Sequence, residues 1–171
     1  MALHGCAVIY ALDVDYRDDG AGHVALAGFT QWTDARPAIE RVTVVSPVAP
    51  YEPGAFYKRE LPCLLAALAL VAAPTCVVVD GHVWLRALDD AGLGARLYEA
   101  LHGAAPVVGV AKQAFADGVA KPVLRGASKQ PLWVSAVGVD VSEACDHVRA
   151  MHGEHRIPTL LRRVDALCRG R

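Results

Sequence analysis

The alternation of hydrophobic and polar side chains predicts strands in the first part of the chain. Residues 6–16 are apolar and rich in β-prone types, and residues 23–32 form a second such run. The Asp-Asp-Gly sequence at 18–20 favours a tight turn between them. Residues 39–45 alternate with a period of two, as a half-buried strand does. Successive strands of this kind indicate an antiparallel meander.

Helical spacing of apolar side chains begins after this meander. Over residues 56–71 the apolar positions share one face, and Glu60 lies on that face. Pro62 cannot donate a backbone hydrogen bond, so we expect a kink or a helix start close to it. Further helices are expected over 88–101, over 142–151 with Ser142 as N-cap, and over 158–168 with Pro158 opening the helix.

Two continuous apolar runs, residues 75–80 and 106–110, are typical of buried parallel strands. Residues 121–124 and 132–137 indicate a late hairpin. The order of elements predicts an α/β fold whose mixed sheet is antiparallel first and parallel later, with helices on its faces. A length of 171 residues suits one domain spanning residues 1–171.

Composition excludes several classes of protein. Hydrophobic residues make up 54% of the chain and charged residues 20%, which is incompatible with intrinsic disorder. The most apolar run, residues 61–76, is interrupted by prolines and is shorter than the roughly 20 residues that cross a bilayer. The first residues lack the basic region of a signal peptide. We therefore expect no membrane association.

The cysteines suggest a reducing compartment. There are 5 of them, widely spaced and without a Cys-x-x-Cys pair, so neither a disulfide framework nor a zinc site is indicated. Most lie in apolar runs and are expected to be buried hydrophobic side chains. A cytoplasmic location follows as an expectation.

Acidic side chains at strand ends provide the candidate chemistry. Asp13 lies within the first predicted strand, Asp80 ends an apolar run, and Glu60 lies on the helix between them. Carboxylates that converge repel one another, and a divalent metal removes that repulsion. Such a site suits phosphodiester hydrolysis, because Mg²⁺ activates water and neutralises charge on phosphorus. Ordinary strand caps and turns are the alternative explanation.

Several sequence blocks, in order, resemble the endonuclease V family, the ribonuclease H-like nucleases of inosine-containing nucleic acids. The first strand, ALDVDY, resembles the family's GVDVAY. The blocks that follow are PYEPGAFYKRE (50–60), VVVDGH (77–82), GVAK (109–112), PLWVS (131–135), VSEA (141–144) and HRIPTLLRRVD (155–165). Because they span nearly the whole chain, we expect a ribonuclease H-like fold and a divergent, N-terminally short member of this family.

The resemblance implies a set of catalytic residues. Asp13, Glu60 and Asp80 match the family's metal-binding carboxylates, which take Mg²⁺ with Mn²⁺ as a substitute. Asp165 matches a fourth site residue on the last helix, and Lys112 matches the lysine that meets the phosphate. The implied reaction cuts one nucleotide beyond a deaminated purine, on its 3′ side, and leaves a 3′-hydroxyl and a 5′-phosphate. Without the resemblance, the alternative interpretations are that Lys112 is a solvent-exposed cation and that Asp165 forms an ion pair on the surface of a helix.

The resemblance also implies substrate contacts. Tyr51 matches the wedge that fills the gap left by the extruded base, and Gly54 and Gly109 match glycines around the hypoxanthine pocket. His82 matches the histidine of the Asp-Gly-His block. An aromatic ring can stack where a base has left, and glycine lets backbone approach a purine closely. Without the resemblance, Tyr51 would be a loop anchor and His82 a structural histidine.

Charges and departures from the family pattern leave the substrate open. We expect a monomer that binds inosine-containing DNA or RNA, with basic side chains tracking the nucleic-acid backbone: Lys121, Arg125, Lys129, Arg156, Arg162 and Arg163. Glu52 places a negative charge in the wedge, where it would repel phosphate, and Val139-Asp140 replaces a His-Arg pair. The alternatives are a nuclease of this fold with another target, or a domain that binds nucleic acid without cutting it.

Overall fold

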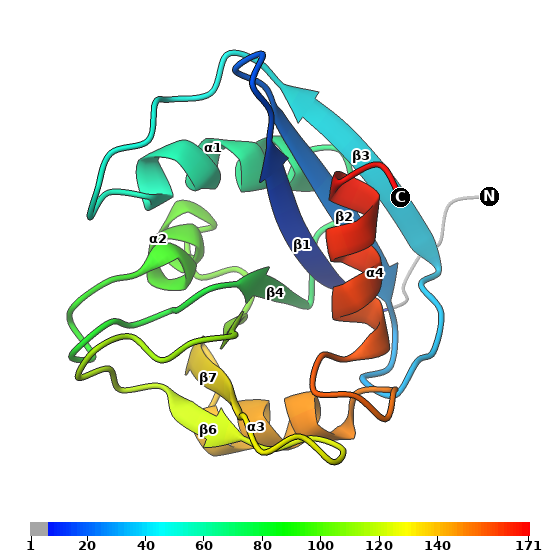
Figure 1. The fold of residues 1–171 in the computed structure, drawn as a ribbon. Helices are drawn as coiled ribbons and strands as arrows, with labels where there is room; N and C mark the ends of the chain where they lie inside the picture. The colour runs from blue at the N-terminus through cyan, green and yellow to red at the C-terminus, as the bar shows by residue number, and fades with distance from the viewer. Residues whose placement is uncertain (1–6) are drawn as a thin grey trace.

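The computed structural model describes residues 7–171, and its centre is a mixed sheet of strand order β3-β2-β1-β4-β5-β7-β6 (Figure 1). The first half is the predicted meander, because β1 (Ile9–Tyr16) pairs antiparallel with β2 (Gly22–Phe29), which pairs antiparallel with β3 (Ile39–Val45). Cys6, the predicted start of the first strand, lies outside the described residues.

The second half contains the parallel pairings. β4 (Cys76–Asp80) runs parallel to β1, and β5 (Val107–Ala111) runs parallel to β4. β7 (Leu132–Val137) is antiparallel to β5, and the short β6 (Lys121–Val123) completes the predicted hairpin at the sheet edge. Because Leu12 pairs with Val79, the next residues on each strand, Asp13 and Asp80, lie side by side.

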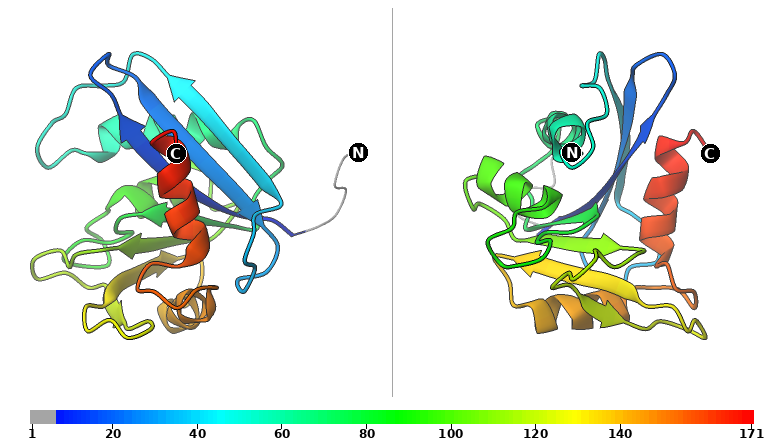
Figure 2. Two further views of the ribbon diagram at one scale, coloured as in Figure 1. Left: turned by 45° about the vertical axis from the view of Figure 1, so that its right-hand side comes forward. Right: turned by 60° about the vertical axis from the view of Figure 1, so that its left-hand side comes forward.

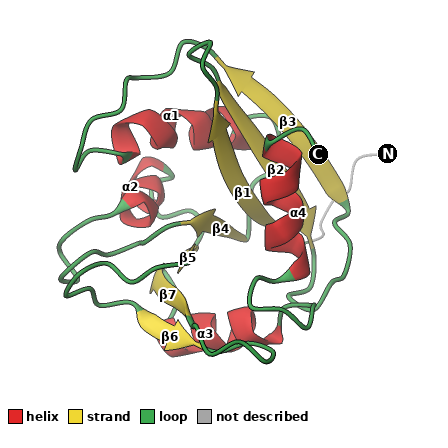
Figure 3. Ribbon diagram, in the orientation of Figure 1, coloured by secondary structure: helices red, strands yellow, loops and turns green. Residues whose placement is uncertain are grey.

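The helices form two layers, one on each face of the sheet, as Figures 2 and 3 show. α1 (Tyr57–Leu68) and α2 (Leu93–Ala100) cover one face, and α3 (Val141–Ala150) and α4 (Thr159–Cys168) cover the other. Side chains alternate between the two layers along β1. Tyr10 and Leu12 pack in the core of α1 and α2, whereas Ile9 and Ala11 pack in the core of α3 and α4.

The same alternation decides where the acidic side chains point. Asp13 is two residues beyond Ala11, and Asp80 is two residues beyond Val78, which packs in the same core. Both carboxylates therefore share the face that α4 covers. The predicted convergence of the first and fourth strands follows from burial of their apolar runs at the centre of the sheet.

Two predicted element boundaries were wrong. Residues 88–92 are not helical, because Gly92 is extended (φ −88°, ψ −167°) and Arg86 pairs with Asp90 in the preceding turn. α3 is capped by Asp140 rather than Ser142, since the Asp140 carboxylate accepts the backbone N–H of Ser142 at 2.8 Å. Pro62 lies inside α1, five residues after its start.

Other expectations can be compared directly. The described cysteines are all free and buried: Cys63, Cys76, Cys145 and Cys168. Among residues 7–171, no helix combines the length and the apolar character needed to cross a membrane.

Candidate active site

A cavity of about 390 Å³ opens between the C-terminal ends of β1 and β4 and the inner face of α4. Its polar lining comes from Asp13, Asp80, Lys112, Asp165 and Arg162, and its remaining walls are aliphatic. α4 packs against both β1 and β2, which fixes Asp165 opposite Asp13. The cavity thus unites four of the five residues predicted to act in catalysis.

Asp13 is the most crowded of these acids. Burial and the neighbouring charges of Asp80 and Asp165 together raise the pKa of its carboxyl group to about 7, against the hydrogen bond from Val14 N–H. Ligand atoms of Asp13, Asp165 and Cys168 all lie within 4.8 Å of one another. Negative charge is therefore concentrated at the point along β1 where its pairing with β4 ends.

Glu60 approaches the same acids from α1, on the other side of β1. The residue is only 4% exposed, and its Oε2 atom has no hydrogen-bond partner. Burial raises the pKa of this carboxyl to about 8, with contributions from the charges of Asp13 and Asp80. A buried, unpartnered carboxylate is costly unless a cation accompanies it.

Two cations already balance part of this charge. Lys112 Nζ lies 3.5 Å from Asp80 Oδ2. Arg169 Nε donates to Asp165 Oδ1 at 2.9 Å. Although burial acts to raise the pKa of Asp165, the bond from Arg169 and the charges of Arg169 and Lys112 lower it. Asp165 therefore has both the ion pair that we gave as its ordinary role and a place in the cavity wall.

The backbone around Lys112 is held by arginine side chains. The Arg156 guanidinium donates to the carbonyl oxygen of Lys112 and, at 2.8 Å, to that of Pro131. Arg125 is 5% exposed and donates to backbone carbonyls in the segment that leads into α4: Met151, Gly153 at 3.1 Å, His155 at 2.7 Å and Arg156 at 3.4 Å. The segment between α3 and α4 is thus joined to the start of the loop after β5.

This network corrects part of the predicted nucleic-acid surface. Arg125 is enclosed by protein, and Arg163 is paired with Glu40 of β3 at 2.6 Å. Neither guanidinium is free to follow a nucleic-acid backbone. Neither role could be recognised in the sequence, because the acceptors of Arg125 are main-chain oxygens about 30 residues away and Glu40 is 123 residues from Arg163.

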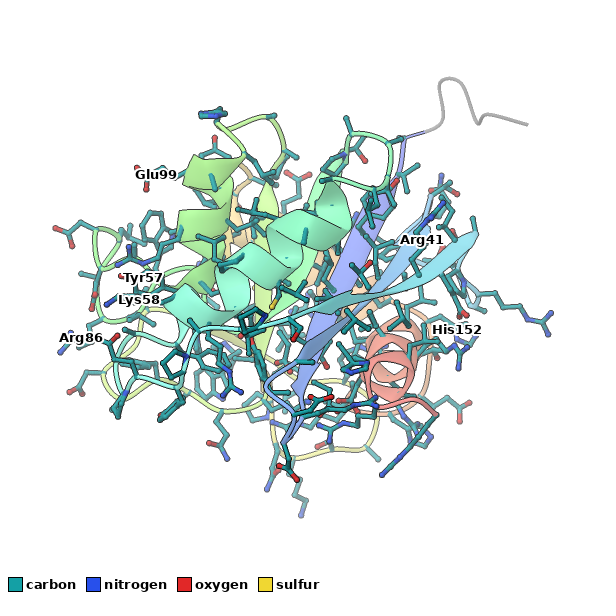
Figure 4. All side chains as sticks on the ribbon, turned by 90° about the horizontal axis from the view of Figure 1, so that it is seen from above. Arg41, Tyr57, Lys58, Arg86, Glu99 and His152 are labelled. Carbon is teal, nitrogen blue, oxygen red and sulfur yellow. The ribbon has the colours of Figure 1, made fainter. Side chains whose placement is uncertain are left out.

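The predicted wedge lies in the exposed loop before α1. Tyr51 is 62% exposed, and its ring lies 6.5 Å from that of Phe56, tilted by 60°. Gly54 has a φ of +77°, a conformation that favours glycine. Glu52, expected to repel phosphate, forms an ion pair with Lys58 at 3.1 Å, so its charge is balanced locally. Figure 4 shows Lys58 at the start of α1, on the opposite side of the view from the side chain of His152.

Gly109, the other glycine predicted to surround the base, lies in β5 and is enclosed by backbone of this chain. A Cβ atom on Gly109 would stand 2.5 Å from the carbonyl oxygen of Gly81, so only glycine fits there. Ser135 Oγ accepts the backbone N–H of Val83 at 2.8 Å beside this contact. His82 Nε2 lies 3.0 Å from the Gln113 carbonyl oxygen, whereas its Nδ1 atom is buried without a partner. One ring nitrogen of His82 therefore contacts the protein backbone, and the other has no hydrogen-bond partner among the described residues.

Comparisons with known proteins find similar sequences and structures. A family model described as Endonuclease V matches residues 2–138. Endonuclease V of Streptomyces avermitilis is 32% identical over 96% of this chain and 80% of its own length, and that of Streptomyces coelicolor is 34% identical over 96% and 79%. The crystal structure of the Streptomyces avermitilis protein superposes with a TM-score of 0.80 at 30% identity, covering 97% of this chain and 81% of that one.

A more distant structure shares the fold. The Ciona intestinalis endonuclease V, solved with a 24mer DNA that contains an inosine followed by a ribo-adenosine, has a TM-score of 0.82 at 17% identity, covering 99% of this chain and 87% of that one.

Proposed function

Because the chain belongs to the endonuclease V family, we propose that it is a metal-dependent endonuclease that hydrolyses the phosphodiester backbone of DNA on the 3′ side of inosine. The observation that carries the proposal is the convergence of Asp13, Asp80 and Asp165 in one cavity, with Glu60 buried behind them. Few purely structural arrangements tolerate so much like charge. The nucleic-acid partner is supported by the inosine-containing DNA bound to the Ciona intestinalis relative.

The donor set suits a hard divalent cation. All the candidate ligands, Asp13, Glu60 and Asp80, offer carboxylate oxygens, which Mg²⁺ prefers and Mn²⁺ accepts. The unpartnered Oε2 atom of Glu60 is a buried acceptor that such a cation would satisfy. When bound there, the cation supplies an activated water and charge neutralisation at the phosphate. The raised pKa values of Asp13 and Glu60 agree with a site built for a positive charge.

Protein side chains supply the remaining contacts to the phosphate. Lys112 is a compact charge at the cavity wall, and its contact with Asp80 can be exchanged for one with a phosphate oxygen. The contact of Arg156 with the Lys112 carbonyl holds that strand end in place while the side chain moves. Asp165, opposite Asp13, adds a further acceptor for a metal-bound or attacking water.

Recognition of the base is assigned to the loops beside the cavity. Tyr51 is free to stack where inosine leaves the helix, because its side chain is 62% exposed. Gly54 and Gly109 allow backbone groups to approach the extruded base. The unsatisfied Nδ1 atom of His82 is a candidate hydrogen-bond partner at the same pocket.

Cleavage of defined oligonucleotides tests the proposal. Single- and double-stranded substrates with inosine at one position are incubated with protein and Mg²⁺ or Mn²⁺, with adenine at that position as the control. We expect a single nick in the inosine-containing strand, one nucleotide beyond inosine, and at least about a hundredfold slower cutting by Asp80→Asn, as for the loss of a group that stabilises the transition state. Asp146→Asn, an exposed carboxylate on α3, is the matched control and cuts at the wild-type rate.

The same assay separates the alternatives. Cutting that is equal for inosine and adenine substrates would indicate a nuclease with another target. Binding without any nick under either metal would identify a domain that has lost catalysis and would refute the proposed function.

A further inference from the structure

Arg162 differs from the other arginines around the cavity because, within residues 7–171, its guanidinium forms neither an ion pair nor a hydrogen bond, whereas Arg125 and Arg156 donate to main-chain carbonyls. Among residues 7–171, Arg163 is paired with Glu40 and Arg169 with Asp165, whereas Arg162 takes part in no ion pair. Arg162 is exposed, and it lines the same cavity as Lys112 and Asp165.

The position of Arg162 on α4 explains this access. Arg162 and Asp165 are three positions apart in the sequence and therefore lie on the same face of the helix, in successive turns. Asp165 reaches the acidic end of the cavity, so Arg162 stands at its rim, one turn toward the start of α4. Arg163, the next residue, points away toward β3, where Glu40 holds it.

Resting on the proposed function, we propose that Arg162 is a phosphate-binding residue that contacts the DNA backbone at a linkage next to the one that is cut. The Arg162 guanidinium, which forms no ion pair with the described part of the protein, can bind an anion at the rim of the acidic cavity once a metal cation balances the carboxylates. The phosphodiester backbone of DNA is such an anion. Lys112 faces the scissile phosphate from the end of β5, and Arg162 faces a neighbouring phosphate from α4. Two anchors on different elements orient the strand across the carboxylates, which a single point charge cannot do.

The salt dependence of binding tests the charge contact. Fluorescence anisotropy with a labelled single-stranded inosine oligonucleotide, in Ca²⁺ and in 50 to 200 mM KCl, gives the slope of log K against log salt. Removing one phosphate contact reduces that slope by about 0.7 for a single strand and weakens binding on the order of fivefold at 0.1 M salt. We expect this change for Arg162→Ala with inosine and adenine oligonucleotides alike, and a wild-type slope for Arg162→Lys and for Arg163→Ala.

Neutral methylphosphonate linkages locate the contact. Each linkage near inosine is replaced in turn, and binding is measured for the wild type and for Arg162→Ala. One linkage adjacent to the scissile one is expected to weaken wild-type binding and to have no further effect on the variant. This non-additivity is the signature of a direct contact.

The outcomes distinguish this inference from the proposed function. An unchanged slope for Arg162→Ala, with specific wild-type cutting intact, would overturn the role of Arg162 alone. A slope that falls equally for Arg163→Ala would mean a diffuse charge effect and would also overturn it. Wild-type protein that binds no oligonucleotide would overturn both proposals together.

Discussion

Replacing Arg125 with alanine removes the side chain that holds the segment between α3 and α4. The guanidinium donates to four backbone carbonyl groups of that segment, and the residue is 5% exposed. A buried acceptor that loses its donor costs about 1–3 kcal/mol, and charged donors lie at the upper end of that range. Water admitted to the vacated space satisfies some of these oxygens, so the losses do not add in full.

From these contributions we expect Arg125→Ala to lower the free energy of unfolding by about 3 kcal/mol. For a chain of this size, this corresponds to a fall in Tm of roughly 6–12 °C. Arg125→Lys retains the charge but not the planar fork, so its loss should be intermediate. Arg149→Ala, which removes an exposed ion pair with Asp146, should change stability by less than about 1 kcal/mol.

Urea unfolding followed by circular dichroism measures these differences for the three variants. The slope of the unfolding free energy against urea should stay constant, because the surface exposed on unfolding is the same. If Arg125→Ala unfolds within about 1 kcal/mol of the wild type, the arginine does not hold this segment, and the explanation for how Lys112 and α4 are positioned is wrong.

Three further predictions concern the acids and the pocket. Burial raises the pKa of Glu60 in the folded protein to about 8 from 4.5, so this group stabilises the metal-free protein most below pH 4.5, and that stability is lost as the pH rises through 8. Glu60→Gln should remove about 1–3 kcal/mol of this loss between pH 5 and 9, measured by urea unfolding in EDTA, and an identical pH profile for the two proteins would disprove the assignment. Millimolar Mg²⁺ should raise the Tm of the wild type by several degrees, more at pH 8 than at pH 6 because the ligands must lose protons, and a similar rise in Asp13→Asn would place the ion elsewhere. Gly109→Ala should lower the free energy of unfolding by about 1–3 kcal/mol, because the new Cβ meets the Gly81 carbonyl at 2.5 Å, and it should also reduce cleavage at inosine. Thermal melting and the oligonucleotide assay check the two effects, and a variant with wild-type values would show that the space beside Gly109 is larger than described.

The sequence predicted the part of the site that strands build. Continuous apolar runs had to be buried at the centre of the sheet, so Asp13, within the first run, and Asp80, at the end of the other, had to lie close together. The face on which they emerge also follows from the period of two. For this reason, the mixed character of the sheet and its main carboxylates could be inferred before any coordinates.

Interactions that depend on distant backbone could not be inferred in this way. The acceptors of Arg125 are carbonyl groups, which every residue has, so no residue type marks them. The choice between Asp140 and Ser142 as N-cap depended on a two-residue shift of the helix start, and both residue types cap helices well. The pairing of Glu52 with Lys58 required the loop to fold back toward α1.

The fastening of Lys112 through its main-chain oxygen has a practical consequence for mutagenesis. Arg156 donates its hydrogen bond to the main-chain carbonyl oxygen, an atom that every amino acid possesses, so exchanging the side chain at position 112 keeps this hydrogen bond. A loss of cleavage activity in Lys112→Ala or Lys112→Met can then be ascribed to the missing ammonium group and not to a displaced backbone at the end of β5.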